Sequence, residues 1–122
     1  MQDRTDYRFL GRLRLAGMLF EQGKTGEALG ILEKLMSTKS APEELRSVAR
    51  LLWVGHQLDT GTPATLQAAL VPLLRPDNSF FPMASEQAAL LALKEGDALK
   101  AKGYLEAALK SPQLSQIQQQ RL

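Results

Sequence analysis

The chain has one histidine, His56, and it lies three residues before Asp59. Residues three apart in a helix share a face, so this pair could act as an acid and a base. A hydrolase would also need a nucleophile and oxyanion donors around the pair. The sequence has no phosphate-binding loop, metal motif or nucleophile elbow. We therefore expect His56 to be a half-buried structural residue near a helix end, and the protein to be no enzyme. A small hydrolase using His56 is the alternative from another class.

Arginines recur at every fourth position near the amino end of the sequence: Arg4, Arg8 and Arg12. This spacing forms a basic stripe on a helix, which could receive an acidic peptide or lie against anionic lipid head groups. Arg46 and Arg50 make a second pair with the same spacing. The alternative for both sets is a solvated helix face.

The composition is that of one ordinary globular domain covering residues 1–122. The chain has 44% hydrophobic and 23% charged residues, and its net charge of +2 is too small to indicate a nucleic-acid partner. It contains no cysteine, which excludes disulfide and thiolate chemistry. No motif for a metal or another cofactor is present. We expect a domain that folds without either.

No apolar run approaches the roughly 18 to 20 residues that cross a bilayer. The longest one covers only residues 88–93. The amino end does not look like a signal peptide, because Asp3 and Asp6 interrupt it. As given, the chain is expected to be soluble.

The elements that position these residues are predicted to be helices, since Leu and Ala are abundant and β-branched residues are scarce. Prolines at 42, 63, 82 and 112 fit the first turn of a helix, and the cap candidates are Ser40 or Ala41, Thr62, Asp97 and Ser111. The predicted helices cover residues 5–22, 25–37, 42–60, 63–74, 81–95 and 98–110, with a short capping helix from about 112.

Three glycines, Gly23, Gly61 and Gly96, recur at separations of 38 and 35 residues. Each follows an acidic or polar pair at the end of a helical stretch, and apolar residues at a period of 3.6 surround it. Glycine adopts the left-handed conformation that ends a helix without steric cost. These features predict three helical hairpins, at about 5–37, 42–74 and 81–110, followed by a cap at 112–122.

The hairpins resemble tetratricopeptide repeats, in which a small residue follows the glycine and apolar residues follow at further helical spacings. The matching sets are Gly23, Ala28, Leu32 and Leu35; Gly61, Leu66, Leu70 and Leu73; and Gly96, Ala101, Leu105 and Ala108. Leu66 stands where the family has a small residue, and the usual aromatic early in each first helix is missing. The resemblance implies a right-handed α-solenoid of three hairpins plus a C-terminal capping helix, and a protein-binding role.

A narrower resemblance covers most of the chain. The stretches 7–16, 58–64 and 72–80, together with Gly96, Asp97 and Ala98, are similar to the soluble periplasmic part of the YfgM-like ancillary translocon proteins of proteobacteria. That family implies an amino-terminal membrane anchor and a domain on the periplasmic side of the inner membrane. The implied partners are translocation-channel subunits or periplasmic chaperones, and the implied role is to assist secretion or folding. A self-associating scaffold factor, for instance a homodimer, is the alternative.

In stacked hairpins the first helix of each pair lines an inner face, and this face is the predicted partner-binding site. Its residues are Leu10, Arg14, Gly17, Val48, Leu52, Gly55, Met83, Gln87 and Leu90. Gly17 and Gly55 occupy equivalent places, where either close helix packing or room for a bound chain would offset the helix-weakening effect of glycine.

Three further predictions concern aromatic residues and the tail. Trp53 is expected to fill the core. Of Phe80 and Phe81, one is expected to fill the junction between repeats while the other is exposed. In the tail, Leu114, Ile117 and Arg121 keep helical spacing, which suits a cap or a contact with another copy.

Overall fold

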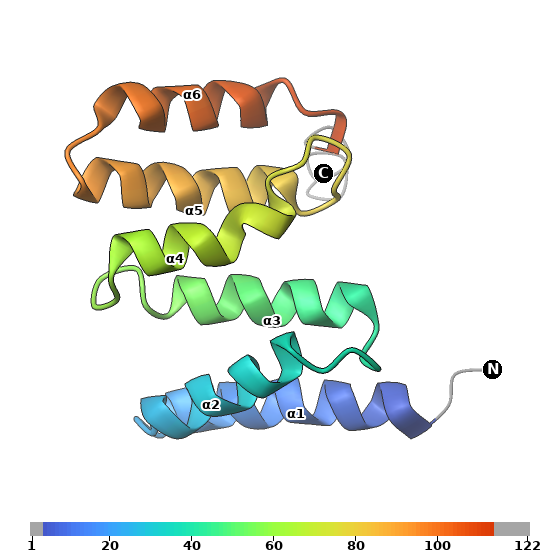
Figure 1. Ribbon diagram of the computed structural model, residues 1–122. Coiled ribbons are helices and arrows are strands. Elements are labelled where there is room, and N and C mark those ends of the chain that lie inside the picture. Colours follow the sequence, from blue (N-terminus) through green and yellow to red (C-terminus); the bar gives the residue numbers. More distant parts are fainter. Residues whose placement is uncertain (1–3, 114–122) are drawn as a thin grey trace. The chain divides into compact units, whose positions relative to one another are not determined.

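The computed structural model describes residues 4–113, with the side chains of residues 7–113, and every regular element in this range is a helix (Figure 1). The elements are α1 (Arg4–Glu21), α2 (Thr25–Met36), α3 (Glu43–Gly55), α4 (Pro63–Leu70), the 3-10 turn η1 (Val71–Leu73), α5 (Phe81–Lys94) and α6 (Ala98–Leu109). The predicted all-α class is confirmed. No helix in the described range is long and apolar enough to cross a membrane.

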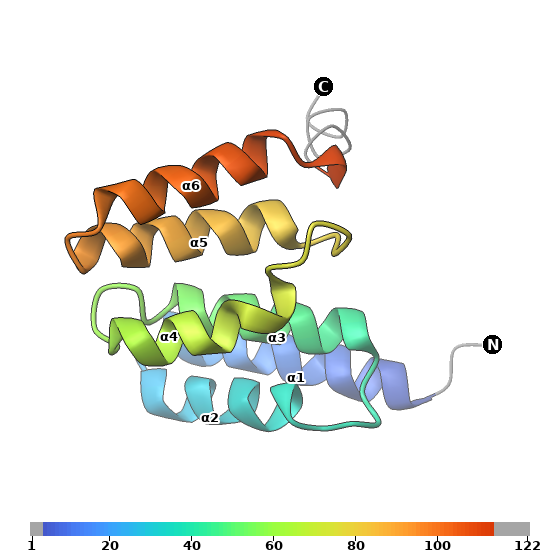
Figure 2. The ribbon, with the colours of Figure 1, turned by 45° about the horizontal axis from the view of Figure 1, so that its top comes forward.

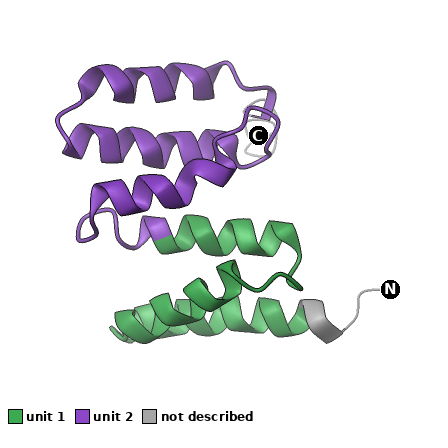
Figure 3. Cartoon of the chain, viewed as in Figure 1, with its two compact units in different colours: residues 1–53 green, residues 54–122 purple. Residues whose placement is uncertain are grey.

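The chain divides into two compact units, residues 1–53 and residues 54–122 (Figure 3). The division falls inside α3. The predicted hairpin at 5–37 is therefore contained in the first unit and the one at 81–110 in the second. The predicted middle hairpin at 42–74 includes the boundary.

In the first unit, α1 and α2 form an antiparallel pair, and the start of α3 adds to the same core (Figures 1 and 2). Gly23 has a φ of +78° in the turn, where its N–H donates to the carbonyl of Phe20 at 3.0 Å. The core contains many alanines, which let the helices approach closely. Its buried members are Phe9, Ala16, Ala28, Leu32, Leu35, Ala41 and Ala49.

In the second unit, α4 packs against α5, and α5 pairs with α6. The side-chain amide of Gln67 donates to the carbonyl of Ala88 at 2.9 Å, which ties α4 to α5. Gly96 makes the turn between α5 and α6 with a φ of +79°. Next to it, the Asp97 N–H donates to the carbonyl of Ala92 at 2.9 Å. Small residues again fill the contact between α5 and α6: Ala89, Ala92 and Ala101, with Tyr104 packed against them.

The predicted third helix, 42–60, is wrong at its end, because α3 stops at Gly55 and turns occupy residues 56–60. The carbonyl of Gln57 accepts the N–H groups of both Thr60 and Gly61, at 3.2 and 2.7 Å, and so closes a loop. Gly61 does not have the predicted left-handed conformation. Instead, a Cβ there would lie 3.0 Å from the Gln57 carbonyl and 3.0 Å from the Leu66 side chain, so glycine is needed for space.

The predicted fourth helix, 63–74, also ends early, since α4 stops at Leu70 and η1 follows. Pro72 has no N–H to donate to Ala68, and its ring would clash with that carbonyl in an α-helix. The Val71 N–H reaches back three residues to Ala68 and tightens the chain into the 3-10 turn. The other predicted helix boundaries agree with the structure to within one residue.

Two of the predicted caps are present. Asp97 Oδ1 accepts the N–H of Lys100 at 3.0 Å, and Ser111 Oγ accepts the N–H of Gln113 at 3.2 Å. Thr62 precedes α4 but makes no side-chain cap bond. The remainder of the predicted capping helix, with Leu114, Ile117 and Arg121, lies outside the described residues.

Removing the cap of α6 should destabilise the second unit. In an Asp97→Ala variant the Lys100 N–H loses its acceptor, and we expect the free energy of unfolding to fall by about 0.5–2 kcal/mol. Urea unfolding followed by far-UV circular dichroism measures this. Asp97→Asn is the control, because its side-chain oxygen keeps the acceptor. An Asn variant as unstable as the Ala variant would contradict the capping explanation.

Candidate functional site

His56 and Asp59 do not share a helical face, because α3 ends at Gly55. His56 is exposed, so the expected half-buried position is wrong. The Asp59 carboxylate accepts a hydrogen bond from Lys94 Nζ at 3.0 Å, in an exposed ion pair that contributes little to stability. Within the described range, no three His, Asp or Glu side chains gather closely enough to hold a metal ion.

Two members of the predicted basic stripe, Arg8 and Arg12, have described side chains. The Arg4 side chain is outside the described set, and Arg8 is exposed. Arg12 is half-buried, with its guanidinium 5.3 Å from the centre of the Phe9 ring. This cation–π contact directs Arg12 toward the buried side of α1 rather than away from it.

The second arginine pair is partly buried and bound to its own unit. Arg46 Nε donates to the carbonyl of Ala41 at 3.2 Å. Burial, and then the neighbouring positive charge of Arg46, lower the pKa of Arg50 from its usual value. Arg46 is thus held to the segment before α3, and both arginines are half-buried rather than fully exposed.

None of the nine predicted partner-binding residues is buried. Their surroundings differ between the helices: Leu10, Arg14 and Gly17 are exposed on α1; Val48 is half-buried and Leu52 exposed on α3; Gly55 and Gln87 are half-buried; and Met83 and Leu90 are exposed on α5. Exposed leucine and methionine side chains along a helix are what a partner-binding face requires.

On α1 the exposed face is wider than predicted. Tyr7 and Met18 are 67% and 56% exposed, and helical geometry places them on the same face as Leu10 and Arg14. The sequence prediction missed both residues, although their spacing from Leu10 and Arg14, by three and four residues, was a usable signal. We call Tyr7, Leu10, Arg14, Gly17 and Met18 the α1 stripe.

A second exposed face runs along α5. Met83, Leu90 and Leu93 are 42%, 43% and 52% exposed, and the exposed carboxylate of Glu86 lies among them. Met83 and Leu90 were among the predicted residues. Glu86 and Leu93 were missed, because the prediction took a single line of residues along α5: Met83, Gln87 and Leu90. We call Met83, Glu86, Leu90 and Leu93 the α5 stripe.

The two equivalent glycines differ. A Cβ on Gly17 would have no atom within 4 Å, so close packing is wrong there and open space remains. At Gly55 a Cβ would lie 3.2 Å from the Gln87 side-chain nitrogen, which is a close approach. Gly17 thus contributes room to the α1 stripe.

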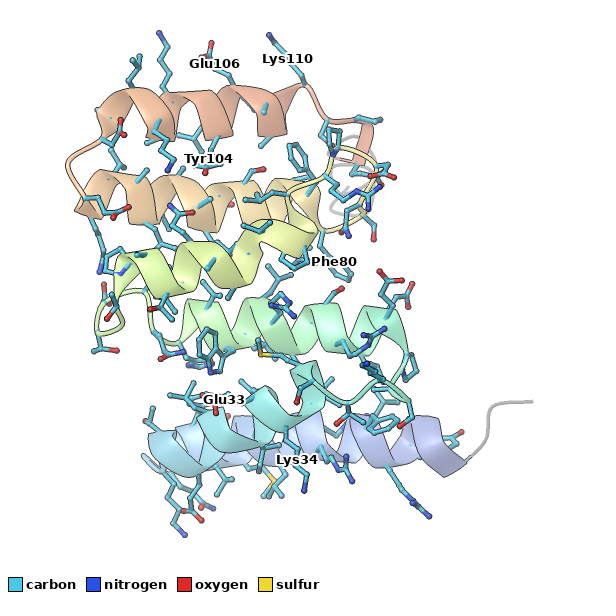
Figure 4. The ribbon with its side chains drawn as sticks, in the orientation of Figure 1. Glu33, Lys34, Phe80, Tyr104, Glu106 and Lys110 are labelled. Carbon is cyan, nitrogen blue, oxygen red and sulfur yellow. The ribbon has the colours of Figure 1, made fainter. Side chains whose placement is uncertain are left out.

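The aromatic residues Trp53 and Tyr104 pack within their own units. Trp53 is half-buried against the core of the first unit, and its Nε1 donates to Glu33 Oε1 at 3.1 Å; Glu33 is labelled in Figure 4. Phe81 is buried and Phe80 is half-buried, so the prediction that one of them is exposed is wrong. Tyr104 points from α6 toward α5, whereas Glu106 and Lys110 point away from it (Figure 4).

Comparison of the chain with models of protein families, with curated proteins and with solved structures finds no match. The resemblances to tetratricopeptide and YfgM-like proteins therefore stay predictions from the residues. The exposed stripes on α1 and α5 are the features from which a function can be argued.

Proposed function

We propose that this chain is a non-enzymatic protein-binding module, folded as a right-handed α-solenoid of three tetratricopeptide-like hairpins with a C-terminal cap. In this proposal it is the soluble domain of an envelope protein on the periplasmic side of a bacterial inner membrane, where it assists secretion or folding. The placement rests on the YfgM-like residues, and the binding role rests on the helices.

The observation that carries the binding role is the α1 stripe. Tyr7, Leu10 and Met18 expose large apolar surfaces on a single face of one helix, and Arg14 stands in their middle. A helix normally turns such side chains toward the core, so a row that faces outward supports a docking surface for a partner. The partner class that fits is an amphipathic helix, which binds through apolar residues spaced by three and four.

The test is site-specific photocrosslinking of the full-length gene product in its native host. A photoreactive amino acid at Met18 should capture translocation-channel subunits or periplasmic chaperones, identified by mass spectrometry. The same amino acid at Lys34 is the control, because Lys34 is exposed on α2 and lies off the stripe. Equal products from both positions, or none from Met18, would contradict the proposal.

A further inference from the structure

The α1 stripe and the α5 stripe have the same spacing. On α1 the residues are Tyr7, Leu10, Arg14 and Gly17, and on α5 they are Met83, Glu86, Leu90 and Leu93. Within each set, consecutive residues are three, four and three positions apart. This is the pattern of two helices that pack along a common line. Each set extends over about 15 Å of helix, at a rise of 1.5 Å per residue, so the two have equal length.

We propose that α1 of one copy of this chain packs antiparallel on α5 of a second copy. The inference rests on the proposed function in one respect: it takes the α1 stripe to be a docking surface, and it names the occupant as the same protein. In this register Tyr7 faces Leu93, Leu10 faces Leu90, Arg14 faces Glu86 and Gly17 faces Met83 of the other copy.

The charges favour this occupant and this direction. Each stripe holds one charged residue among apolar ones, and the two charges are opposite: Arg14 on α1 and Glu86 on α5. Among the described side chains, neither takes part in an ion pair. The antiparallel register brings the two charges together, whereas the parallel register would place Arg14 against Leu90 and Glu86 against Leu10. An unpaired charge against an apolar side chain is unfavourable, so the charges select the antiparallel arrangement.

The shapes agree with the charges. Gly17 has open space where its Cβ would be, and in this register the long, flexible side chain of Met83 lies opposite it. At the other end, the ring of Tyr7 lies opposite the side chain of Leu93. Apolar residues therefore flank the Arg14 and Glu86 pair on both sides and shield it from water, which strengthens it.

The assembly that this contact forms is either a reciprocal twofold dimer, with α1 of each copy on α5 of the other, or a chain or ring in which each copy offers α1 to one neighbour and α5 to another. Its average size should therefore increase with protein concentration.

Charge exchange tests the contact by sedimentation velocity over a range of concentrations. We expect Arg14→Glu and Glu86→Arg each to weaken assembly by about 10-fold or more, because like charges then face each other. The double variant, and an equimolar mixture of the two single variants, should assemble like the wild type. Lys24→Glu and Glu106→Arg are matched controls, which make the same charge changes at exposed positions off both stripes and should have no effect.

Disulfide trapping tests the register, since the natural chain has no cysteine. A mixture of Tyr7→Cys and Leu93→Cys proteins should form a crosslinked heterodimer on mild oxidation. A mixture of Tyr7→Cys and Met83→Cys proteins, which would be adjacent in the parallel register, should not. A disulfide needs Cα atoms closer than about 7 Å, so the two registers give different products.

The outcomes are separable. A wild type that stays monomeric at every concentration, or a double variant and mixture that fail to restore assembly, overturns the inference. Circular dichroism shows whether each variant is folded, and Arg14→Gln with Glu86→Gln replaces the reversals if one is not. If the chain is monomeric while Met18 crosslinks other proteins, the inference fails and the proposed function stands. If the chain assembles through Arg14 and Glu86 while Met18 captures only further copies, the inference stands and the proposed function fails.

Discussion

Replacing Leu32 by alanine should lower the free energy of unfolding of the first unit by about 2–5 kcal/mol. Leu32 is fully buried in α2, in a core whose other buried residues are largely alanines: Ala28 on α2 itself, Ala16 on α1 and Ala49 on α3. Alanine neighbours have no spare side-chain length with which to fill the cavity that the substitution leaves. The cost therefore belongs in the upper part of this range.

Trp53 is a probe of this core. It is the single tryptophan of the chain and packs against the core that contains Leu32. Urea unfolding followed by its fluorescence thus reports the loss of packing around that core. Leu15→Ala is the matched control, since Leu15 is 47% exposed on α1 and its truncation leaves no cavity. If Leu32→Ala and Leu15→Ala lower the free energy of unfolding equally, Leu32 does not fill the core of the first unit.

The helices could be predicted from the sequence wherever local chemistry marks their ends. Pro63 at the start of α4 and the left-handed Gly23 and Gly96 after α1 and α5 act within a few residues, and each of these boundaries was placed to within one residue. Such signals need no tertiary information, because proline and glycine restrict or free the backbone by themselves.

The end of α3 could not be predicted in this way. Apolar residues continue at helical spacing through Leu58, so the pattern favours a longer helix. What ends it is a loop in which Gln57 accepts two N–H groups, and in which Gly61 gives room to Leu66. That room depends on where α3 ends and α4 begins, which the spacing of apolar residues does not specify. Gly61 consequently looks like Gly23 and Gly96 in the sequence while its role is different.

The predicted inner face and the exposed stripes on α1 and α5 share residues but do not coincide. The residues expected on the inner face are exposed or half-buried, as a surface requires. However, a helical pattern does not tell whether an apolar residue at the edge of a face, such as Met18 or Leu93, packs inward or remains outside. The contact of Arg12 with Phe9 was missed for the same reason, because a residue at the edge of the buried face can turn toward the core or toward solvent.

A triple variant, Gly11→Ala, Gly17→Ala and Gly30→Ala, should raise the free energy of unfolding of the first unit by about 1.5–3 kcal/mol. All three glycines lie inside α1 or α2, and a Cβ added at any of them meets no atom within 4 Å. Alanine loses less backbone freedom than glycine when a helix forms, at roughly 0.5–1 kcal/mol per position. The three positions are on different turns, so their effects should add.

Gly23→Ala is the opposing control. Its φ of +78° is a left-handed conformation, which costs a residue with a Cβ roughly 1–2 kcal/mol, so this variant should lose stability although its site is equally open. Trp53 fluorescence during urea unfolding measures all of these variants. A triple variant no more stable than the natural chain would show that α1 and α2 are limited by something other than glycine entropy.

Gly17 connects this stability series to the proposed contact between copies. As a single change, Gly17→Ala should stabilise the first unit while it weakens assembly, because its methyl group occupies space that Met83 of another copy would use. Gly11→Ala and Gly30→Ala lie off the α1 stripe and should stabilise without any effect on assembly. Sedimentation of the three single variants shows whether Gly17 affects assembly in addition to the stability of α1. If Gly17→Ala assembles as well as the other two, the open space at Gly17 serves no contact with Met83.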